Sequence, residues 1–286
     1  RSHDEHRQPL VVSACPAWVK YCEQFTPELL PMLSTLKTPQ QISGTIIKSV
    51  LPAGDDQKRL YTVSVTPCTA MKFEARRDSM TRKGISDIDT VLTVRELARL
   101  VVLYGIDITN IDPEPADEPM ALRSSSSLLA ETAGGITESV LRSLALKAGI
   151  RETDRQASKR LRSTGEFRDA AVTIAGTEYS VAVVDGLKGL EKLRRMIDSG
   201  VRYDLVEIMV CPGGCVNGGG MLPAGSKEAV RQRSKYIWQT DDSEAVRGPE
   251  QSASVALLYY RVFQQCPELS DKKLFHTHFS EREVLI

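Results

Sequence analysis

Four of the six cysteines lie in three short loops, and their number and spacing suit a metal cluster. The loops span residues 13–18, 66–74 and 211–220, and they contain Cys15, Cys68, Cys211 and Cys215. Four thiolates brought together from separate loops are the ligand set that a 4Fe-4S cubane requires. The sequence therefore predicts that these four sulfurs converge on one iron-sulfur core.

The spacing of the third loop favours close wrapping around such a core. Pro-Gly-Gly separates Cys211 from Cys215, and glycine accepts positive φ angles and leaves room for a cluster face. Proline next to the cysteines, at Pro16, Pro67 and Pro212, stiffens the loops and removes N–H donors that would raise the potential of a cubane. Simple turn formation explains the prolines as well, and both explanations can hold together.

The three loops resemble the signature motifs of the catalytic domain of iron-iron hydrogenases. Further matches occur in the family's order at residues 38–45, 87–89, 95–98, 133–135 and 276–279. The resemblance implies an H-cluster, in which the cubane is joined through the sulfur of Cys215 to a two-iron unit with CO, cyanide and an azadithiolate bridge. It implies reversible conversion of H2 to protons and electrons, with a redox partner or accessory iron-sulfur domain and with maturation proteins.

Two positions depart from the family pattern in ways that affect chemistry. The residue before the first ligand is usually a proton-passing cysteine, and here it is Ala14. A lysine that donates to a cyanide is replaced by Met71, and a thioether cannot donate. The adjacent Lys72 is expected to point elsewhere. A methyl group at position 14 cannot carry a proton, so we expect slow turnover and a sensory role.

The resemblance also implies roles for residues around the cluster. Ser34 matches a serine of the family's proton path, and Met209 is retained before the third ligand loop, whereas Thr66 replaces the methionine expected before the second. Residues expected to line or contact the cofactor are Thr38, Pro39, Gln40, Pro67, Met71, Gly134 and Met209. Thr38 is equally well explained as a helix cap, and Gly134 as part of a glycine turn that opens a helix.

The remaining cysteines and a histidine pair have simpler interpretations. Cys22 lies two helical turns after Cys15, which favours a thiol packed on a helix face. Cys266 matches no ligand position and is expected to be structural or exposed. His276 and His278 have a metal-like spacing on an expected strand, but without other ligands they are interpreted as a surface feature that closes the domain.

Two other functions remain open at this point. The chain resembles, more weakly, eukaryotic hydrogenase-like proteins that hold only a cubane for cluster assembly, and these also have alanine at the position of Ala14. They usually carry serine at the position of Gly213, which favours the hydrogenase. An unrelated α/β enzyme with structural cysteines would require all three loop matches to be accidental.

Composition limits the partners and the compartment. The chain has 286 residues, of which 37 are basic and 37 acidic, so no net charge attracts nucleic acid or an anionic membrane. No apolar stretch is long enough to span a membrane and no signal peptide is evident, so a cytoplasmic location with reduced thiols is expected. The early position of Cys15 predicts that the start of the catalytic lobe is missing. Because no C-x2-C-x2-C run is present, we expect electrons to be exchanged through upstream residues or a partner.

The elements that would position the ligands read as strand–loop–helix units. Apolar runs at residues 60–65 and 205–210 lead directly into Cys68 and Cys211, and ligands gather where strands leave an open α/β sheet. Capping signals predict helices from Thr38 to about Val50 and from Thr93 to Gly105. Further helices are expected at residues 135–147, 187–197 and 226–239, and a hairpin at residues 171–184 that turns at 175–177.

The alternation of these elements predicts an α/β fold with two lobes, each a small sheet flanked by helices. The first lobe is assigned to residues 10–120 and the second to residues 121–250, with a C-terminal helix and closing tail at 251–286. We expect the cluster in the cleft between the lobes.

Overall fold

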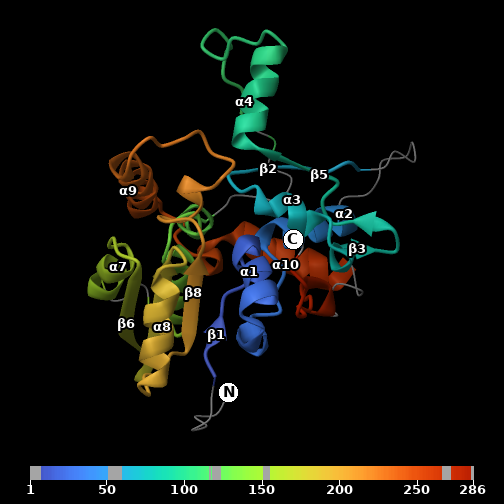
Figure 1. Cartoon of the computed structure of the whole chain (residues 1–286). Helices are drawn as coiled ribbons and strands as arrows, with labels where there is room; N and C mark the ends of the chain where they lie inside the picture. Colours follow the sequence, from blue (N-terminus) through green and yellow to red (C-terminus); the bar gives the residue numbers. More distant parts are fainter. Residues whose placement is uncertain are drawn as a thin grey trace.

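A computed structural model describes residues 8–50, 60–115, 117, 124–150, 155–265 and 272–284. Figure 1 shows small sheets surrounded by helices, which is the predicted α/β class. Within the described residues, no helix combines the length and the apolar character needed to cross a membrane.

The larger sheet has four strands in the order β1-β8-β7-β6. Their bounds are Leu10–Val11 for β1, Phe167–Ile174 for β6, Thr177–Asp185 for β7 and Leu205–Met209 for β8. Strand β8 runs parallel to both β1 and β7, whereas β6 and β7 form an antiparallel hairpin. The predicted turn is confirmed, since Ala175 and Gly176 both have positive φ, as a two-residue hairpin turn of type I′ requires.

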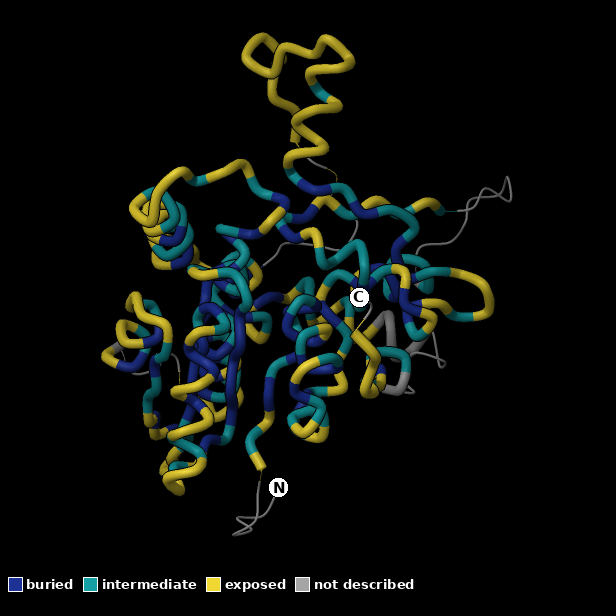
Figure 2. Tube along the Cα trace, in the orientation of Figure 1, coloured by how far each residue is buried: buried dark blue, intermediate teal, exposed yellow. Residues whose placement is uncertain are grey.

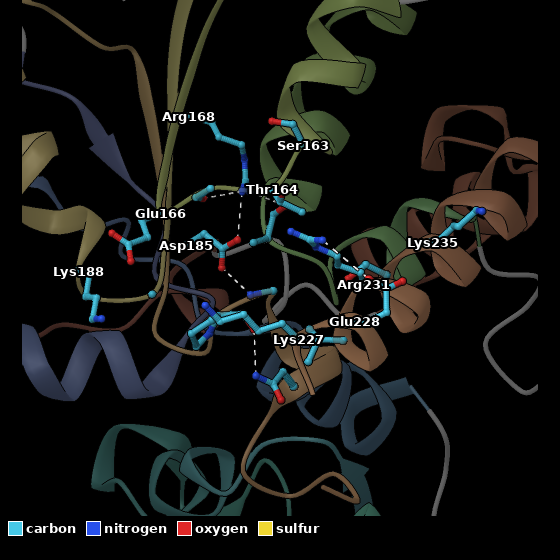
Figure 3. Close-up of a pocket in the computed structure, with 18 of the residues that line it drawn as sticks. Ser163, Thr164, Glu166, Arg168, Asp185, Lys188, Lys227, Glu228, Arg231 and Lys235 are labelled. Atoms are coloured by element: carbon cyan, nitrogen blue, oxygen red, sulfur yellow. Dashed lines mark hydrogen bonds and ion pairs between the residues drawn. The ribbon is translucent and has the colours of Figure 1, made fainter. Parts of the chain in front are cut away.

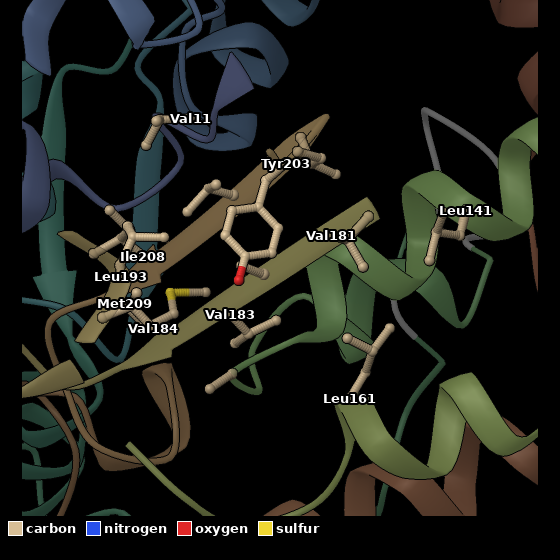
Figure 4. Close-up of a cluster of buried hydrophobic side chains, with 14 of the residues drawn as sticks. Val11, Leu141, Leu161, Val181, Val183, Val184, Leu193, Tyr203, Ile208 and Met209 are labelled. Atoms are coloured by element: carbon tan, nitrogen blue, oxygen red, sulfur yellow. The ribbon is translucent and has the colours of Figure 1, made fainter. Parts of the chain in front are cut away.

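The main hydrophobic core surrounds this sheet (Figure 4). Every residue of β8 is buried, as are the four residues 181–184 of β7. Such continuous burial means that both faces of these strands are covered, in contrast to the alternating burial of a one-sided sheet. The covering helices are α6 (Gly135–Lys147), α7 (Arg155–Leu161) and α8 (Gly189–Asp198). The bounds predicted for α6 are confirmed, and α8 begins two residues later than expected.

The second sheet has two parallel strands, β2 (Val63–Thr66) and β5 (Thr90–Thr93). Strand β2 is shorter than the predicted residues 60–65 because Thr62 bonds through its backbone N–H and hydroxyl to the carboxylate of Asp89. Each strand is followed by a helix, α3 (Ala70–Ala75) and α4 (Val94–Leu103) respectively. Thr93 caps α4 in the predicted capping box. Helix α4 and the chain after it project from the rest of the molecule and are exposed (Figures 1 and 2).

The other helices connect and cover the two sheets. Helix α2 confirms the prediction that a helix follows Thr38, and α9 begins one residue after its cap, Ser226. The remaining α-helices are α1 (Pro16–Phe25), α2 (Pro39–Val50), α5 (Ser126–Leu129), α9 (Lys227–Ser243) and α10 (Ala253–Gln265). The 3-10 helices are η1 (Pro27–Met32), η2 (Asp78–Met80), η3 (Cys215–Asn217), η4 (Pro249–Gln251) and η5 (Lys272–Phe275). A short hairpin is formed by β3 (Thr81–Arg82) and β4 (Ile85–Ser86).

Strand β1 links the two predicted lobes. It lies in the first lobe by sequence, yet it pairs with β8 of the second, with Leu10 opposite Leu205. The loop that carries Cys15 therefore leaves the same sheet as the loop that carries Cys211. The boundary between the lobes at residue 120 stays a prediction.

Candidate functional site

Cys15 occupies the point where β1 passes into α1. It is the N-cap residue of α1 and is buried. Burial raises the pKa of the Cys15 thiol, whereas hydrogen bonds from the backbone of Val210 and Trp18 lower it in part. Amide groups of a helix N-terminus favour an anionic sulfur. The contact with Val210 also brings the first cysteine loop beside the third.

Cys68 lies between β2 and α3 and is also buried. Burial raises the pKa of its thiol, and the backbone of Ala70 and Met71, in the first turn of α3, hydrogen-bonds to the sulfur and lowers the pKa in part. Its own N–H donates to the hydroxyl of Thr66, 3.3 Å away. The Cys68 loop therefore repeats the arrangement at Cys15, with a cysteine at a strand end and a helix start.

The loop from Cys211 to Cys215 follows β8 and depends on its glycines. Gly213 and Gly214 have φ angles of 88° and 91°, as glycine was expected to permit. A Cβ atom on Gly214 would lie 2.6 Å from the backbone nitrogen of Ala133, so no larger residue fits. The N–H of Gly213 donates to Asp185 Oδ1 at 2.5 Å, which fixes the loop against the end of β7.

Backbone hydrogen bonds join the three loops. The N–H of Gly220 donates to Pro67 O at 2.8 Å, which joins the third loop to the second. The N–H of Val216 donates to Glu131 O at 3.1 Å, and the N–H of Ala133 donates to Gly213 O at 3.2 Å. The segment before α6 thus forms one more wall beside the cysteines.

The four thiols are close enough to influence one another electrostatically. The pKa of Cys215 is raised well above its ordinary value, first by burial and then by repulsion from Glu131, Cys15, Cys68 and Cys211. Repulsion between thiolates also raises the pKa of Cys15, Cys68 and Cys211. All four are free thiols. In the described part of the chain, no three His, Cys, Asp or Glu side chains are arranged to hold a metal ion.

The four thiols equal in number the donors that an iron-sulfur cubane requires. Thiolates that lie near one another repel, and a positively charged metal between them offsets that repulsion. That the four sulfurs share one core stays a prediction.

Several residues expected near the cofactor have other contacts. The Thr38 hydroxyl accepts the N–H of Gln41 at 3.4 Å, so Thr38 caps α2 as one of the two interpretations expected. The same hydroxyl also donates to Glu74 Oε2 at 2.7 Å. Gly134 starts α6 with a φ of 91°, and its N–H donates to Glu207 Oε1 at 2.8 Å. The glycine turn that opens a helix is therefore present.

The remaining expected residues lie on the elements beside the loops. The side-chain amide of Gln40 donates to Met71 O at 3.5 Å and accepts from Ser64 Oγ at 2.7 Å, which ties α2 to α3 and to β2. Met209 is buried at the end of β8, and Pro39, the first residue of α2, is exposed. Ser34 is partly buried, and its N–H donates to Val11 O.

Both departures from the family pattern are visible in the structure. Ala14 is partly buried beside Ser13, whose hydroxyl donates to Leu36 O at 2.8 Å. Lys72 points away as expected, because its Nζ lies 2.7 Å from Glu96 Oε2 on α4. Neither position 14 nor position 71 offers a hydrogen-bond donor at its side chain.

Cys22 is a packed thiol, as predicted. It is fully buried, and its Sγ donates to Thr26 O at 3.3 Å. Its pKa is raised mainly by burial. The expected strand at the histidine pair is wrong, since His276 makes only an isolated bridge to Leu36 and its Nδ1 is 2.7 Å from Thr35 Oγ1. Cys266 lies outside the described residues.

Two buried carboxyl groups near the loops were not anticipated. Glu131 has a pKa raised by burial, and its Oε2 has no hydrogen-bond partner in the described structure. Glu74, on α3, has a pKa raised to about 7, again by burial. No sequence signal could have found either one, because their burial arises from packing between segments that are distant in the chain.

A groove of about 860 Å³ lies behind the third cysteine loop, between α9 and the β6–β7 hairpin (Figure 3). Pro212 and Gly213 form part of its wall. At its base Arg168 is paired with Asp185 at 3.1 Å, and Asp185 in turn holds the N–H of Gly213. Basic side chains surround the groove at Lys188, Lys227, Arg231 and Lys235, and they outnumber the acidic Glu166 and Glu228.

Comparisons with known proteins agree with the loops and the fold. Iron hydrogenase 1 of Clostridium pasteurianum is 33% identical over 282 residues, which cover 96% of this chain and 49% of that protein. The cytosolic Fe-S cluster assembly factor narfl of Danio rerio is 27% identical, over 98% of this chain and 70% of that protein. The chain spans about half the length of the curated hydrogenases that it matches.

A solved structure shares the fold. Apo [FeFe]-hydrogenase HydA1 from Chlamydomonas reinhardtii, variant C377H, superposes with a TM-score of 0.77 at 26% identity, over 97% of this chain and 77% of that one. Residues 1–219 match the family described as the iron only hydrogenase large subunit, C-terminal domain. Together with the three cysteine loops, these matches show that the chain belongs to the iron-only hydrogenase family.

Proposed function

We propose that the chain is a hydrogenase-like domain that converts H2 to protons and electrons slowly, at an H-cluster, and that it serves in sensing. The observation that carries the proposal is that contacts join the three cysteine loops, through Gly220 N–H to Pro67 O and through the backbone of Val210 to the sulfur of Cys15. The relative from Clostridium pasteurianum, named as a hydrogenase, supports the reaction.

The residues present fit the cubane better than they fit the two-iron unit. Four thiols supply the donors of a cubane, and glycine at 213 and 214 permits the positive φ angles of the loop that carries two of them. Around the two-iron unit, Ala14 and Met71 offer no hydrogen-bond donor, and Lys72 is engaged by Glu96. When bound, the two-iron unit would supply the iron at which H2 is split or formed. In the cell, maturation proteins would install it.

The protein's own part is to hold the cluster, exclude water and supply protons. The helix N-termini at Cys15 and Cys68 direct backbone N–H groups at the sulfurs and so favour their anionic form. Because a methyl group at position 14 can neither donate nor accept a proton, the last proton transfer has to use another group. This missing step is the reason that we expect slow turnover.

Electrons would be exchanged through the groove behind the third cysteine loop. Cys211 is the ligand whose neighbours Pro212 and Gly213 line this groove, and the groove carries more basic than acidic side chains. We propose an acidic redox protein as the partner, because a basic rim accelerates and orients encounter with an acidic surface. Changing Lys188 and Lys227 to glutamate should slow reduction of the cluster by such a protein and weaken its salt dependence. The same change at Lys147, which does not line the groove, should leave both unaffected.

A second function is favoured by a specific relative. The assembly factor from Danio rerio matches 98% of this chain, and a protein that holds only a cubane needs no donors at positions 14 and 71. Under this alternative the chain binds a 4Fe-4S cubane and takes part in cluster assembly or in an interaction, without acting on H2.

Infrared spectroscopy separates the two functions. The protein is reconstituted anaerobically with iron and sulfide, cubane assembly is confirmed, and a synthetic two-iron unit is added. The hydrogenase proposal predicts CO and cyanide bands from bound two-iron unit and slow reduction of a viologen by H2. Absence of the bands after confirmed cubane assembly would contradict it and would support the cubane-only function.

A further inference from the structure

Strand β2 has a free edge in the described part of the chain, where its sheet consists of two strands. It pairs with β5 on one side, in parallel. The carbonyl of Thr62 accepts the N–H of Thr90 in β5, so it points toward that strand. Because the N–H and C=O groups of successive residues alternate in direction along a strand, those of Ser64 also point to β5. Those of Val63 and Val65 point to the free edge.

The free edge of β2 and the sheet face beside it are open to solvent. Tyr61, Val63 and Val65 are 67%, 51% and 48% exposed. The other outer strand, β5, is different, because Val91 is 7% exposed and the N–H of Thr93 is bound in the capping box of α4. An incoming strand therefore meets unbonded backbone groups at β2 rather than at β5.

The sequence of β2 carries none of the features that keep an edge strand from pairing. Native edge strands are commonly protected by charged side chains, by proline, by a bulge or by a covering segment. Residues 60–66 contain neither a charge nor a proline. A two-stranded sheet is also only marginally stable by itself, whereas three or more strands with an apolar face form a stable one. The edge is therefore suited to receive a further strand.

Strand β2 of a second copy is complementary to this edge. If the second copy lies antiparallel, with a two-fold axis at Ser64, Val63 of each copy is opposite Val65 of the other. The outward N–H of each valine then meets the outward C=O of the valine opposite, so all of these groups are paired. The uncharged, β-branched side chains also lie opposite one another, where cross-strand pairs stabilise a sheet. A contact of this kind is self-complementary, as a two-fold dimer requires.

Helix α4 adds exposed apolar surface at the end of the same sheet (Figures 1 and 2). It packs against β2 and follows β5, and Leu97 and Leu100 are 39% and 37% exposed, while Leu103 and Tyr104 are 69% and 79% exposed. In the antiparallel arrangement, α4 of each copy lies at the end of β2 where the other copy exposes Tyr61. A stable interface buries about 800 Å² on each partner, and a strand edge alone is too small for this. The apolar side chains of α4 supply the additional area.

We propose that two copies of this chain associate through the free edges of β2, antiparallel and with the two-fold axis at Ser64. The two small sheets then become one continuous sheet in which the β2 strands are central and the β5 strands are outermost. The association does not depend on the proposed hydrogenase function, because no cluster ligand takes part in it. A strand of another protein, or a segment of the same copy outside the described residues, would fill the edge differently, and the experiments distinguish these occupants from a second copy.

The first test combines sedimentation equilibrium with amide hydrogen exchange on the full chain under reducing conditions. At about 100 μM, a hundred times a micromolar dissociation constant, the mass should be twice 31.6 kDa. The N–H groups of Val63 and Val65 should exchange slowly in the dimer and faster after dilution, whereas that of Ser64, which points to β5, should be equally protected in both. A monomer at 100 μM would overturn the proposal. So would a dimer in which dilution leaves the exchange of Val63 and Val65 unchanged.

The second test places charges at the two valines. Val63→Lys combined with Val65→Lys sets like charges opposite one another and should raise the dissociation constant at least about tenfold. Val63→Lys combined with Val65→Glu sets opposite charges against one another when the axis lies at Ser64, so this double variant should recover the dimer. Tyr236→Lys, at an exposed tyrosine of α9, is the matched control and should keep the dimer. Equal dissociation constants for the two double variants, both shown to be folded by circular dichroism, would refute the proposed pairing.

Discussion

Gly214 is the position at which a single methyl group should do most damage to the cysteine loop. Its φ of 91° with ψ of −159° lies in a region used almost only by glycine, so an alanine there costs about 1–3 kcal/mol in backbone strain. The new Cβ would also lie 2.6 Å from Ala133 N and 2.8 Å from Glu131 O, both backbone atoms that cannot rotate away. Such overpacking costs about 1–3 kcal/mol more. Gly214→Ala should therefore lower the free energy of unfolding by about 2–6 kcal/mol.

Gly176→Ala is the matched control for this change. Gly176 also has a positive φ, 81°, but a Cβ there meets nothing within 4 Å, so only a conformational cost of about 1–2 kcal/mol is expected. Urea unfolding of the two cluster-free variants, followed by circular dichroism, measures the difference. Iron binding after reconstitution should fall in Gly214→Ala and stay normal in Gly176→Ala. Equal unfolding midpoints and equal iron contents would refute the packing that we describe around Gly214.

Two further predictions concern the framework around the site. Asp241 is fully buried and pairs with Arg142 at 2.8 Å and with Arg247 at 2.8 Å, so Asp241→Asn should cost about 3–5 kcal/mol in urea unfolding at pH 7. Burial opposes ionisation of Asp241, but hydrogen bonds, of which that from Arg142 contributes most, hold its pKa below the ordinary value. The stabilisation from the ionised carboxylate is therefore lost as the pH falls below about 4. Between pH 7 and pH 3 the free energy of unfolding should fall less in the variant than in the unaltered protein. In the capping box, Thr93→Ala should lower the free energy of unfolding by about 1 kcal/mol, because the side chain at position 93 can no longer accept the N–H of Glu96. Thr93→Ser should keep the cap. Equal melting temperatures for the two variants would contradict this role.

The elements that could be predicted from sequence are those with local signals. The cap at Thr38 and the capping box at Thr93 mark helix starts within four residues, and the turn at Ala175 and Gly176 needs only two adjacent residues with positive φ. Each signal acts over a few residues, so no knowledge of the fold was required.

The parts that could not be predicted depend on distant contacts. Strand β1 has only two residues, and its pairing with β8 joins positions 10 and 205, for which no local pattern exists. The same holds for Glu74 and Glu131, whose burial is set by neighbouring loops and helices. The cysteines were found because their spacing resembles a known family, and the arrangement of their loops then followed from β1, β2 and β8.

Iron and sulfide analysis of reconstituted single-cysteine variants tests the central claim most directly. Unaltered protein should bind about four iron and four sulfide per chain, as one cubane requires. Replacing Cys15, Cys68, Cys211 or Cys215 by serine should each reduce or destabilise this one cluster, whereas Cys22→Ser, at the packed thiol of α1, should leave its iron content unchanged. A full, stable complement of iron in any of the four ligand variants, or its loss in Cys22→Ser alone, would contradict the account.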